Sequence, residues 1–102
     1  MTYDDIARKL VENEAGVEHS TLMKGPCLRY KGDFIAAMFA PENAMIIKVS
    51  AQRVNELIAS GEGREFNFTK KRFKEWVLIP ATLEKQYEKY LREALAYAKQ
   101  RK

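Results

Sequence analysis

The stretch MKGPCLRYKGDFIAAMFAPENAMIIKV, residues 23–49, decides the fold of this chain. It contains three short apolar runs separated by two turn signals, Lys31-Gly32-Asp33 and Ala40-Pro41-Glu42-Asn43. Glycine adopts positive φ without a Cβ clash, and proline followed by asparagine favours a turn. A parallel crossover needs a dozen or more residues, so these short links predict an antiparallel meander. We expect strands over about 22–30, 34–39 and 45–49.

Amphipathic segments on both sides of the meander predict helices. Apolar residues recur on one helical face within residues 3–14, and again within 83–100. Between them, Ser50 is a suitable N-cap for a short helix that Gly61 or Gly63 would end. Two further strands are expected at 64–69 and 74–79, the second closed by Pro80 because proline cannot donate to a ladder.

The resulting element order is α-β-β-β-α-β-β-α. Grouped strands flanked by helices predict a two-layer α+β domain, with a five-stranded antiparallel sheet covered by helices on one face. At 102 residues the chain is expected to form one domain over 1–102. If the other sheet face stays uncovered, its aromatic side chains are candidates for an interface, including a homodimer interface.

Composition limits the location and the chemistry. No apolar run approaches the ~20 residues of a membrane helix, and the acidic N-terminus Met-Thr-Tyr-Asp-Asp is unlike a signal peptide. Cys27 is the only cysteine, which favours a reducing, cytoplasmic setting. With one histidine, the chain is not expected to hold a zinc ion, and no cofactor motif is present.

Cys27 and His19 are the only conceivable nucleophile and base. Such a pair needs hydrogen-bond reach and a lowered thiol pKa. The alternative is that Cys27 is a small buried apolar residue, which is the common state of free cysteine. We favour this second interpretation, and expect a protein without catalytic residues.

The second half of the chain is basic. Residues 51–102 hold twelve lysines and arginines against seven acids, whereas residues 1–50 hold six against seven. A basic cluster with neighbouring phenylalanines makes nucleic-acid binding an alternative function, through phosphates and base stacking. The simpler interpretation is a solvated hairpin connection. The residues of this cluster are Lys70, Lys71, Arg72 and Lys74.

The chain resembles the TfoX N-terminal domain family, known from bacterial competence regulators of the TfoX/Sxy type. The matching features are Met23-x-Gly25, Leu28-x-Tyr30-x-Gly32-x-Phe34-x-Ala36, Phe66, Lys74-x-Trp76-Val77-x-Ile79-Pro80 and the closing helix with Leu91, Ala94 and Ala98. The chain departs from the family at Met23-Lys24-Gly25-Pro26, where members commonly have Met-Phe-Gly-Gly.

The resemblance implies a fold similar to that of secretion chaperones and supplies no catalytic residues. It implies a small cytosolic regulatory module that acts by contact with a protein partner. We expect that contact to use the sheet or the terminal helix, whose Tyr87, Tyr90 and Tyr97 are the residue type enriched at interfaces. The favoured interpretation of Tyr87 and Tyr90 is that they pack on the sheet, while Tyr97 lies partly off the apolar stripe of this helix.

Overall fold

A computed structural model describes residues 3–22, 25–39, 43–68 and 71–101, and the side chains of all of these except 22, 67, 68, 71–74 and 101. Its elements are α1 (Tyr3–Asn13), β1 (Val17–Leu22), β2 (Gly25–Tyr30), β3 (Asp33–Phe39), β4 (Ala44–Lys48), α2 (Ala51–Ser60), β5 (Arg64–Phe68), β6 (Lys71–Ile79), a 3-10 helix η2 (Ala81–Gln86) and α3 (Tyr87–Arg101). The prediction of an α+β chain with an antiparallel sheet is confirmed.

The strands form one open antiparallel sheet in the order β1-β2-β3-β4-β6-β5. The predicted meander supplies β2, β3 and β4 at its centre. After β4 the chain passes through α2 and returns as β5 and β6, and β6 pairs with β4. The edge strands are therefore β1 and β5.

The predicted number of five strands is wrong, because the sheet has six. We expected one strand over 22–30 and none before it; instead β1 and β2 form a hairpin in which Val17 pairs with Tyr30 and Leu22 with Gly25. The element order accordingly has four strands before α2. β1 was missed because an edge strand buries few side chains, so its residues Glu18-His19-Ser20-Thr21 lack the apolar signature of a strand.

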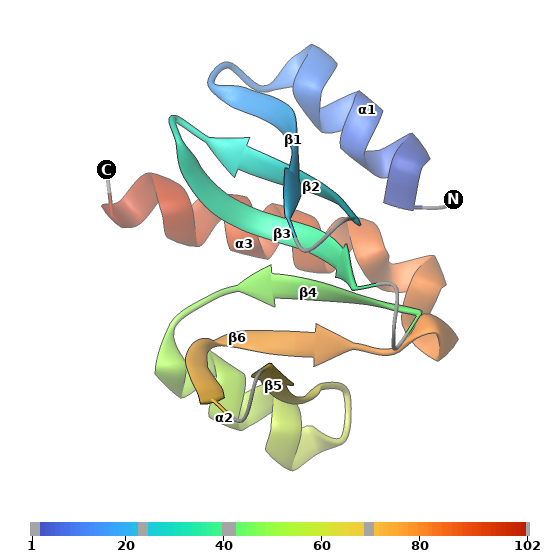
Figure 1. Ribbon diagram of the computed structural model, residues 1–102, viewed down its shortest axis with the longest axis vertical. Helices are drawn as coiled ribbons and strands as arrows, with labels where there is room; N and C mark the ends of the chain where they lie inside the picture. The colour runs from blue at the N-terminus through green and yellow to red at the C-terminus, as the bar shows by residue number, and fades with distance from the viewer. Residues whose placement is uncertain (1–2, 23–24, 40–42, 69–70, 102) are drawn as a thin grey trace.

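One face of the sheet carries the larger core, and all three helices contribute to it. Figure 1 shows α3 running behind the sheet, α1 beside the β1–β2 end and α2 beside the β5–β6 end. Apolar strand residues such as Leu28, Ile47 and Val77 pack there against Leu10 of α1 and Leu91 of α3, all fully buried. Burying a side chain of this size contributes about 1.5–3 kcal/mol relative to exposure, so this core fixes the register of the strands.

Local signals explain the helix boundaries. The Ser50 hydroxyl accepts a hydrogen bond from the Arg53 backbone N–H at 3.1 Å, and Gly61 at φ 85° ends α2 in the left-handed region. Both predictions for this helix are confirmed. The predicted terminal helix is divided, because residues 81–86 form the 3-10 helix η2 and the α-helix begins at Tyr87. Leu83, in the non-helical φ/ψ region, marks the kink.

Candidate surface on the helix-free face of the sheet

The second face of the sheet carries an apolar cluster to which no described helical residue belongs. Its centre is a buried row of residues across four strands, in which Cys27 pairs with Ala37 and Ile46 pairs with Leu78. Each of these four side chains is at most 6% exposed. The side chains of β6 alternate between the two clusters, with Trp76 and Leu78 on this face and Val77 and Ile79 in the helix-side core.

A second row on the same face lies along one end of the buried row and is only half-buried. It consists of Arg29, Phe34, Lys48 and Trp76, one residue from each of β2, β3, β4 and β6. Arg29 pairs with Phe34, and Lys48 pairs with Trp76. Because Lys48 follows Ile47, the partner of Ala36, it lies level with the start of β3. We call these four residues the outer row; along it, cation and aromatic ring alternate from strand to strand.

Arg29 anchors the outer row. Its guanidinium carbon lies 4.2 Å from the centroid of the Phe34 ring, within the range of a cation–π contact. The Arg29 Nε is buried and has no hydrogen-bond partner among the described residues. A buried donor without an acceptor costs about 1–3 kcal/mol, so this group would gain from an acceptor brought by a partner.

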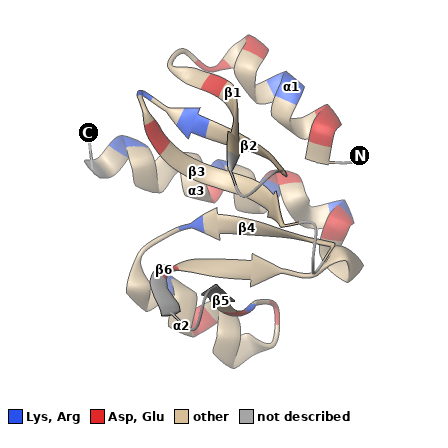
Figure 2. Cartoon of the chain, viewed as in Figure 1, with Lys and Arg blue, Asp and Glu red and all other residues tan. Residues whose placement is uncertain are grey.

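Lys48 is the second cation of the row. It forms no ion pair within the described part of the chain, where the ion pairs join helices or the turn after α1. Figure 2 shows the same contrast, since charges of both signs crowd the helices whereas β4 carries a single basic segment at its end. The face thus combines an apolar floor with two cations available for a partner.

The sheet curls over at its β5 end. The Phe39 and Phe66 rings are in edge-to-face contact with centroids 5.1 Å apart, although β4 and β6 separate their strands. In a flat sheet three strand intervals would hold them about 14 Å apart. The curl has a cause in β6, because Glu65 pairs with Val77 and Asn67 with Arg72, which leaves Phe66 opposite an irregular segment of β6. The helix-free face is therefore concave and closed at this end.

The Cys27 and His19 side chains are not brought together. Cys27 pairs with Ser20 and belongs to the helix-free face, whereas His19 pairs with Leu28, whose side chain is in the helix-side core. Burial raises the pKa of the Cys27 thiol, against a hydrogen bond with Ser20 and the charge of Arg29. A raised pKa disfavours the thiolate, so the preferred interpretation of Cys27 as a buried apolar residue is confirmed.

The basic cluster lies at the tip of the β5–β6 hairpin. Lys70 is outside the described residues, and the backbones of Lys71 and Arg72 pair with Phe68 and Asn67. Lys74 follows within β6. The side chains of the cluster are also outside the described residues, so nucleic-acid binding by this cluster stays a prediction.

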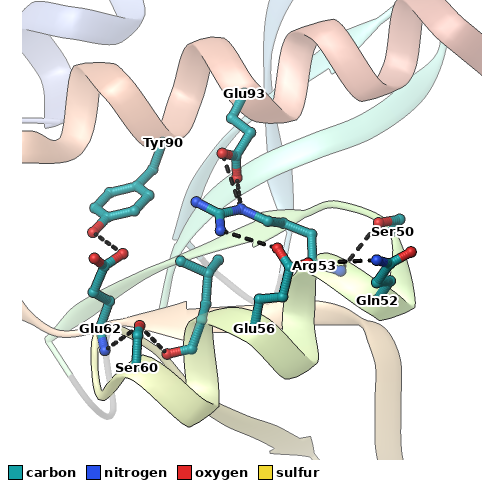
Figure 3. A network of polar contacts seen from close by, with 9 residues as sticks. Ser50, Gln52, Arg53, Glu56, Ser60, Glu62, Tyr90 and Glu93 are labelled. Carbon is teal, nitrogen blue, oxygen red and sulfur yellow. Dashed lines mark hydrogen bonds and ion pairs between the residues drawn. The ribbon is translucent and has the colours of Figure 1, made fainter.

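A polar network joins α2 to α3 on the other side of the molecule (Figure 3). Arg53 Nε donates to both carboxylate oxygens of Glu93, at 3.1 and 2.9 Å, and Tyr90 donates to Glu62 at 3.1 Å. A cavity of about 240 Å³ lies beside it, lined in part by Ser50, Arg53 and Tyr97. Since Tyr97 is hydrogen-bonded to Glu75 and Arg53 to Glu93, these polar groups already have partners.

Tyr87 and Tyr90 are fully buried against the sheet, so the terminal helix does not present them to a partner. Among the described residues, no group of three or more histidines, cysteines and acids lies close enough to hold a metal ion. No helix in the described ranges is long and apolar enough to cross a membrane. Gly63 is buried just before β5, and its backbone N–H donates to the Leu57 carbonyl oxygen across the turn that follows α2.

Sequence reasoning found the rings of the outer row but not the row itself. Trp76, Phe34 and Arg29 all stood within predicted strands. The alignment of Arg29 with Phe34 depends on a register shift between Leu28 and Arg29, caused by a bulge at Ile35. Ile35 and Ala36 both pack in the helix-side core, which breaks the strict alternation that sequence patterns assume. Comparison with protein-family models, curated proteins and solved structures found no match to this chain.

Proposed function

We propose that this chain is a small non-enzymatic interaction module that binds a protein partner through the helix-free face of its sheet. The observation that carries the proposal is the outer row, in which Phe34 and Trp76 remain half-buried beside a fully buried apolar floor. Tryptophan and arginine are enriched among residues that dominate binding energy at interfaces, and the row contains both.

The remaining parts of the proposal rest on the sequence. The resemblance to the TfoX N-terminal domain supports a cytoplasmic, regulatory role and an order of elements similar to that of secretion chaperones. The separation of Cys27 from His19 supports a function without catalysis. The sheet is preferred over the terminal helix as the contact surface because Tyr87, Tyr90 and Leu91 of α3 are covered by the core.

Site-specific photo-crosslinking in the native host tests this proposal. A benzoylphenylalanine replaces Phe34 or Trp76 in turn, and a matched control carries it at Gln86, which is exposed in η2. We expect the same protein to be captured from both face positions and not from Gln86. Capture only from Gln86, or none from any position, would contradict the proposal.

Solution mass measurement on the purified chain shows whether it forms a homodimer, and the crosslinking positions show through which surface. A second copy that binds through this face would be captured as a crosslinked dimer at Phe34 and Trp76. A crosslinked dimer from Gln86 alone would place self-association elsewhere on the molecule.

Nucleic-acid association is the second candidate. The pairing of Lys71 with Phe68 and Arg72 with Asn67 places two members of the basic cluster at one hairpin tip, near the sequence neighbours Lys70 and Lys74. The test is a titration with single-stranded and duplex DNA and with RNA at several salt concentrations. Binding that weakens steeply with salt and is lost when Lys70, Lys71, Arg72 and Lys74 become alanine would support this candidate. The absence of binding at low ionic strength would remove it.

A further inference from the structure

The outer row has a spacing as well as a composition. Neighbouring strands lie about 4.8 Å apart, so Arg29 and Lys48, which are two strands apart, are separated by about 10 Å across the sheet. Phe34 lies between them, and Trp76 lies one strand beyond Lys48. A ligand that matches this row must present anionic and apolar groups alternately, one group for each strand that it crosses.

An α-helix laid across the strands has this repeat. Its pitch is about 5.4 Å, close to the strand interval, and residues i and i+7 on one face are about 10.5 Å apart. Carboxylates at i and i+7 would reach Arg29 and Lys48, and apolar side chains at i+4 and i+11 would reach Phe34 and Trp76. The whole row spans three strand intervals, which corresponds to about three turns of helix.

The charges of the face favour an acidic partner over a second copy of this chain. Two such rows in contact, whether parallel or reversed, bring no carboxylate to Arg29 or Lys48, because the row itself contains no acid. Only Glu18, the exposed partner of Arg29 in β1, adds an acid to this register position. The Arg29 Nε is buried and has no hydrogen-bond partner among the described residues, and a carboxylate is the acceptor that a guanidinium binds most strongly.

We propose that the outer row, Arg29, Phe34, Lys48 and Trp76, is the docking site for a partner helix in which carboxylates and apolar side chains alternate along one face. This inference rests on the proposed function and specifies the chemistry of the partner. Arg29 and Lys48 receive the carboxylates, while Phe34 and Trp76 receive the apolar side chains. Charge decides the orientation and the register of the helix.

Trp76 is the only tryptophan of the chain, so its fluorescence reports directly on this surface. The probe is an alanine-rich helical peptide of about 18 residues, long enough to be helical in solution, with glutamate at i and i+7 and leucine at i+4 and i+11. The control peptide has the same composition with the two leucines moved to the opposite face of the helix, at i+2 and i+9. We expect the first peptide to change Trp76 emission saturably, in a salt-dependent manner, and the control peptide to bind at least about tenfold more weakly.

Charge exchange then tests the pairing itself. Lys48→Glu is expected to weaken the binding of the peptide about tenfold. A peptide with lysine at the position facing residue 48 is expected to restore binding to this variant. Lys48→Gln serves as the milder variant, and circular dichroism verifies that both are folded. The matched control is Lys85→Glu in η2, an exposed lysine away from the sheet face.

Four results would overturn the inference: equal binding of both peptides, equal weakening by Lys48→Glu and Lys85→Glu, no rescue by the exchanged peptide, or binding of single-stranded DNA to Trp76 in place of the peptide. The outcome is distinct from that of the proposed function. Crosslinking at Phe34 and Trp76 to a protein without a helix that alternates carboxylates and apolar side chains along one face would overturn this inference alone.

Discussion

Arg53 of α2 and Glu93 of α3 form a two-bond ion pair in which Arg53 Nε donates to both oxygens of the carboxylate, at 3.1 and 2.9 Å. The two side chains are 32% and 31% exposed, so solvent screens the pair only in part. Arg53 also contacts Glu56 within α2, at 3.3 Å. The pair therefore joins the short helix at the β5–β6 end to the long helix behind the sheet (Figure 3).

We expect a double-mutant cycle with Arg53→Ala and Glu93→Ala to give a coupling energy of about 1 kcal/mol, because the pair is half-buried and charge-assisted. Chemical denaturation measures the free energy of unfolding of each variant. The cycle with Glu56→Ala in place of Glu93→Ala is the matched control, and its coupling should be smaller because Glu56 is more exposed. Equal coupling in both cycles would contradict this prediction.

Glu14 and Glu88 hold α1 and α3 together in a pH-dependent manner. Hydrogen bonds from Lys99 to Glu14, and from Arg92 and Lys9 to Glu88, lower the pKa of each carboxyl. A lowered folded-state pKa means that the stabilisation is present above the ordinary carboxyl pKa and is lost as the pH falls through the folded-state value. NMR titration of the glutamate carboxyl carbons should therefore show Glu14 titrating late on acidification.

The variant Lys99→Gln is expected to return the pKa of Glu14 towards its ordinary range and to leave that of Glu88 unchanged. Lys9→Gln should leave the pKa of Glu14 unchanged and return the pKa of Glu88 only part of the way to its ordinary range, because Arg92 still contacts Glu88 at 2.9 Å. If Glu14 titrates at the same pH with and without Lys99, the ion pair does not form in solution.

Tyr90 makes the alkaline stability limit informative. Burial and the hydrogen bond to Glu62 raise the pKa of Tyr90 to about 12. Because the raised pKa belongs to the folded state, the stabilisation is complete below the ordinary value of 10.0 and is lost as the pH rises towards 12. We expect the free energy of unfolding to fall over this interval.

In the variant Tyr90→Phe the free energy of unfolding should fall less steeply with alkaline pH. Part of the fall should persist, because Tyr3 and Tyr87 also have a raised pKa. Denaturation at a series of alkaline pH values measures the slope. Tyr97→Phe provides the comparison from the same helix. An unchanged slope in Tyr90→Phe would show that folding does not raise the pKa of the Tyr90 hydroxyl.

Gly63 occupies a position where a side chain has no room. A Cβ at this residue would lie 2.6 Å from Val77 Cγ2 and 3.2 Å from Leu57 Cβ. Gly63→Ala is therefore expected to lower the free energy of unfolding by about 1–3 kcal/mol through overpacking. The combination with Val77→Ala removes the closest atom, so the double variant should be more stable than the sum of the single effects predicts.

The control for Gly63→Ala is Gly32→Ala, which meets no atom within 4 Å but has φ of +92°. Its cost should come from backbone strain alone and should not respond to Val77→Ala. Additive effects of Gly63→Ala and Val77→Ala would contradict the steric explanation.

The central strands were predictable from sequence because they are buried on both faces. Ile46 and Ile47 belong to different clusters, and a run of apolar residues such as 34–39 has only one stable place in the sheet. The caps of α2 were predictable for a different reason, since Ser50 and Gly61 satisfy backbone groups that any helix leaves unpaired. In both cases a local pattern determines a local structure.

The edge strand and the outer row were not predictable in the same way. The strand character of Glu18-His19-Ser20-Thr21 comes from pairing with β2, and pairing partners are not visible in a local window. The neighbourhood of Phe39 and Phe66 depends on an irregular stretch of β6 that changes the curvature of the whole sheet. The candidate surface thus arises from register and curvature, which are properties of several strands together.

The curl of β5 also determines how the sheet can grow. An open sheet with two straight edges could add strands at both ends and extend into a filament, but β5 is five residues long and bent by its bulged pairing with β6. The six-residue β1 pairs with β2 along its whole length without a register shift. Edge-to-edge association of this chain would therefore stop at a pair joined through β1, with a β5 edge closing each end of the joined sheet.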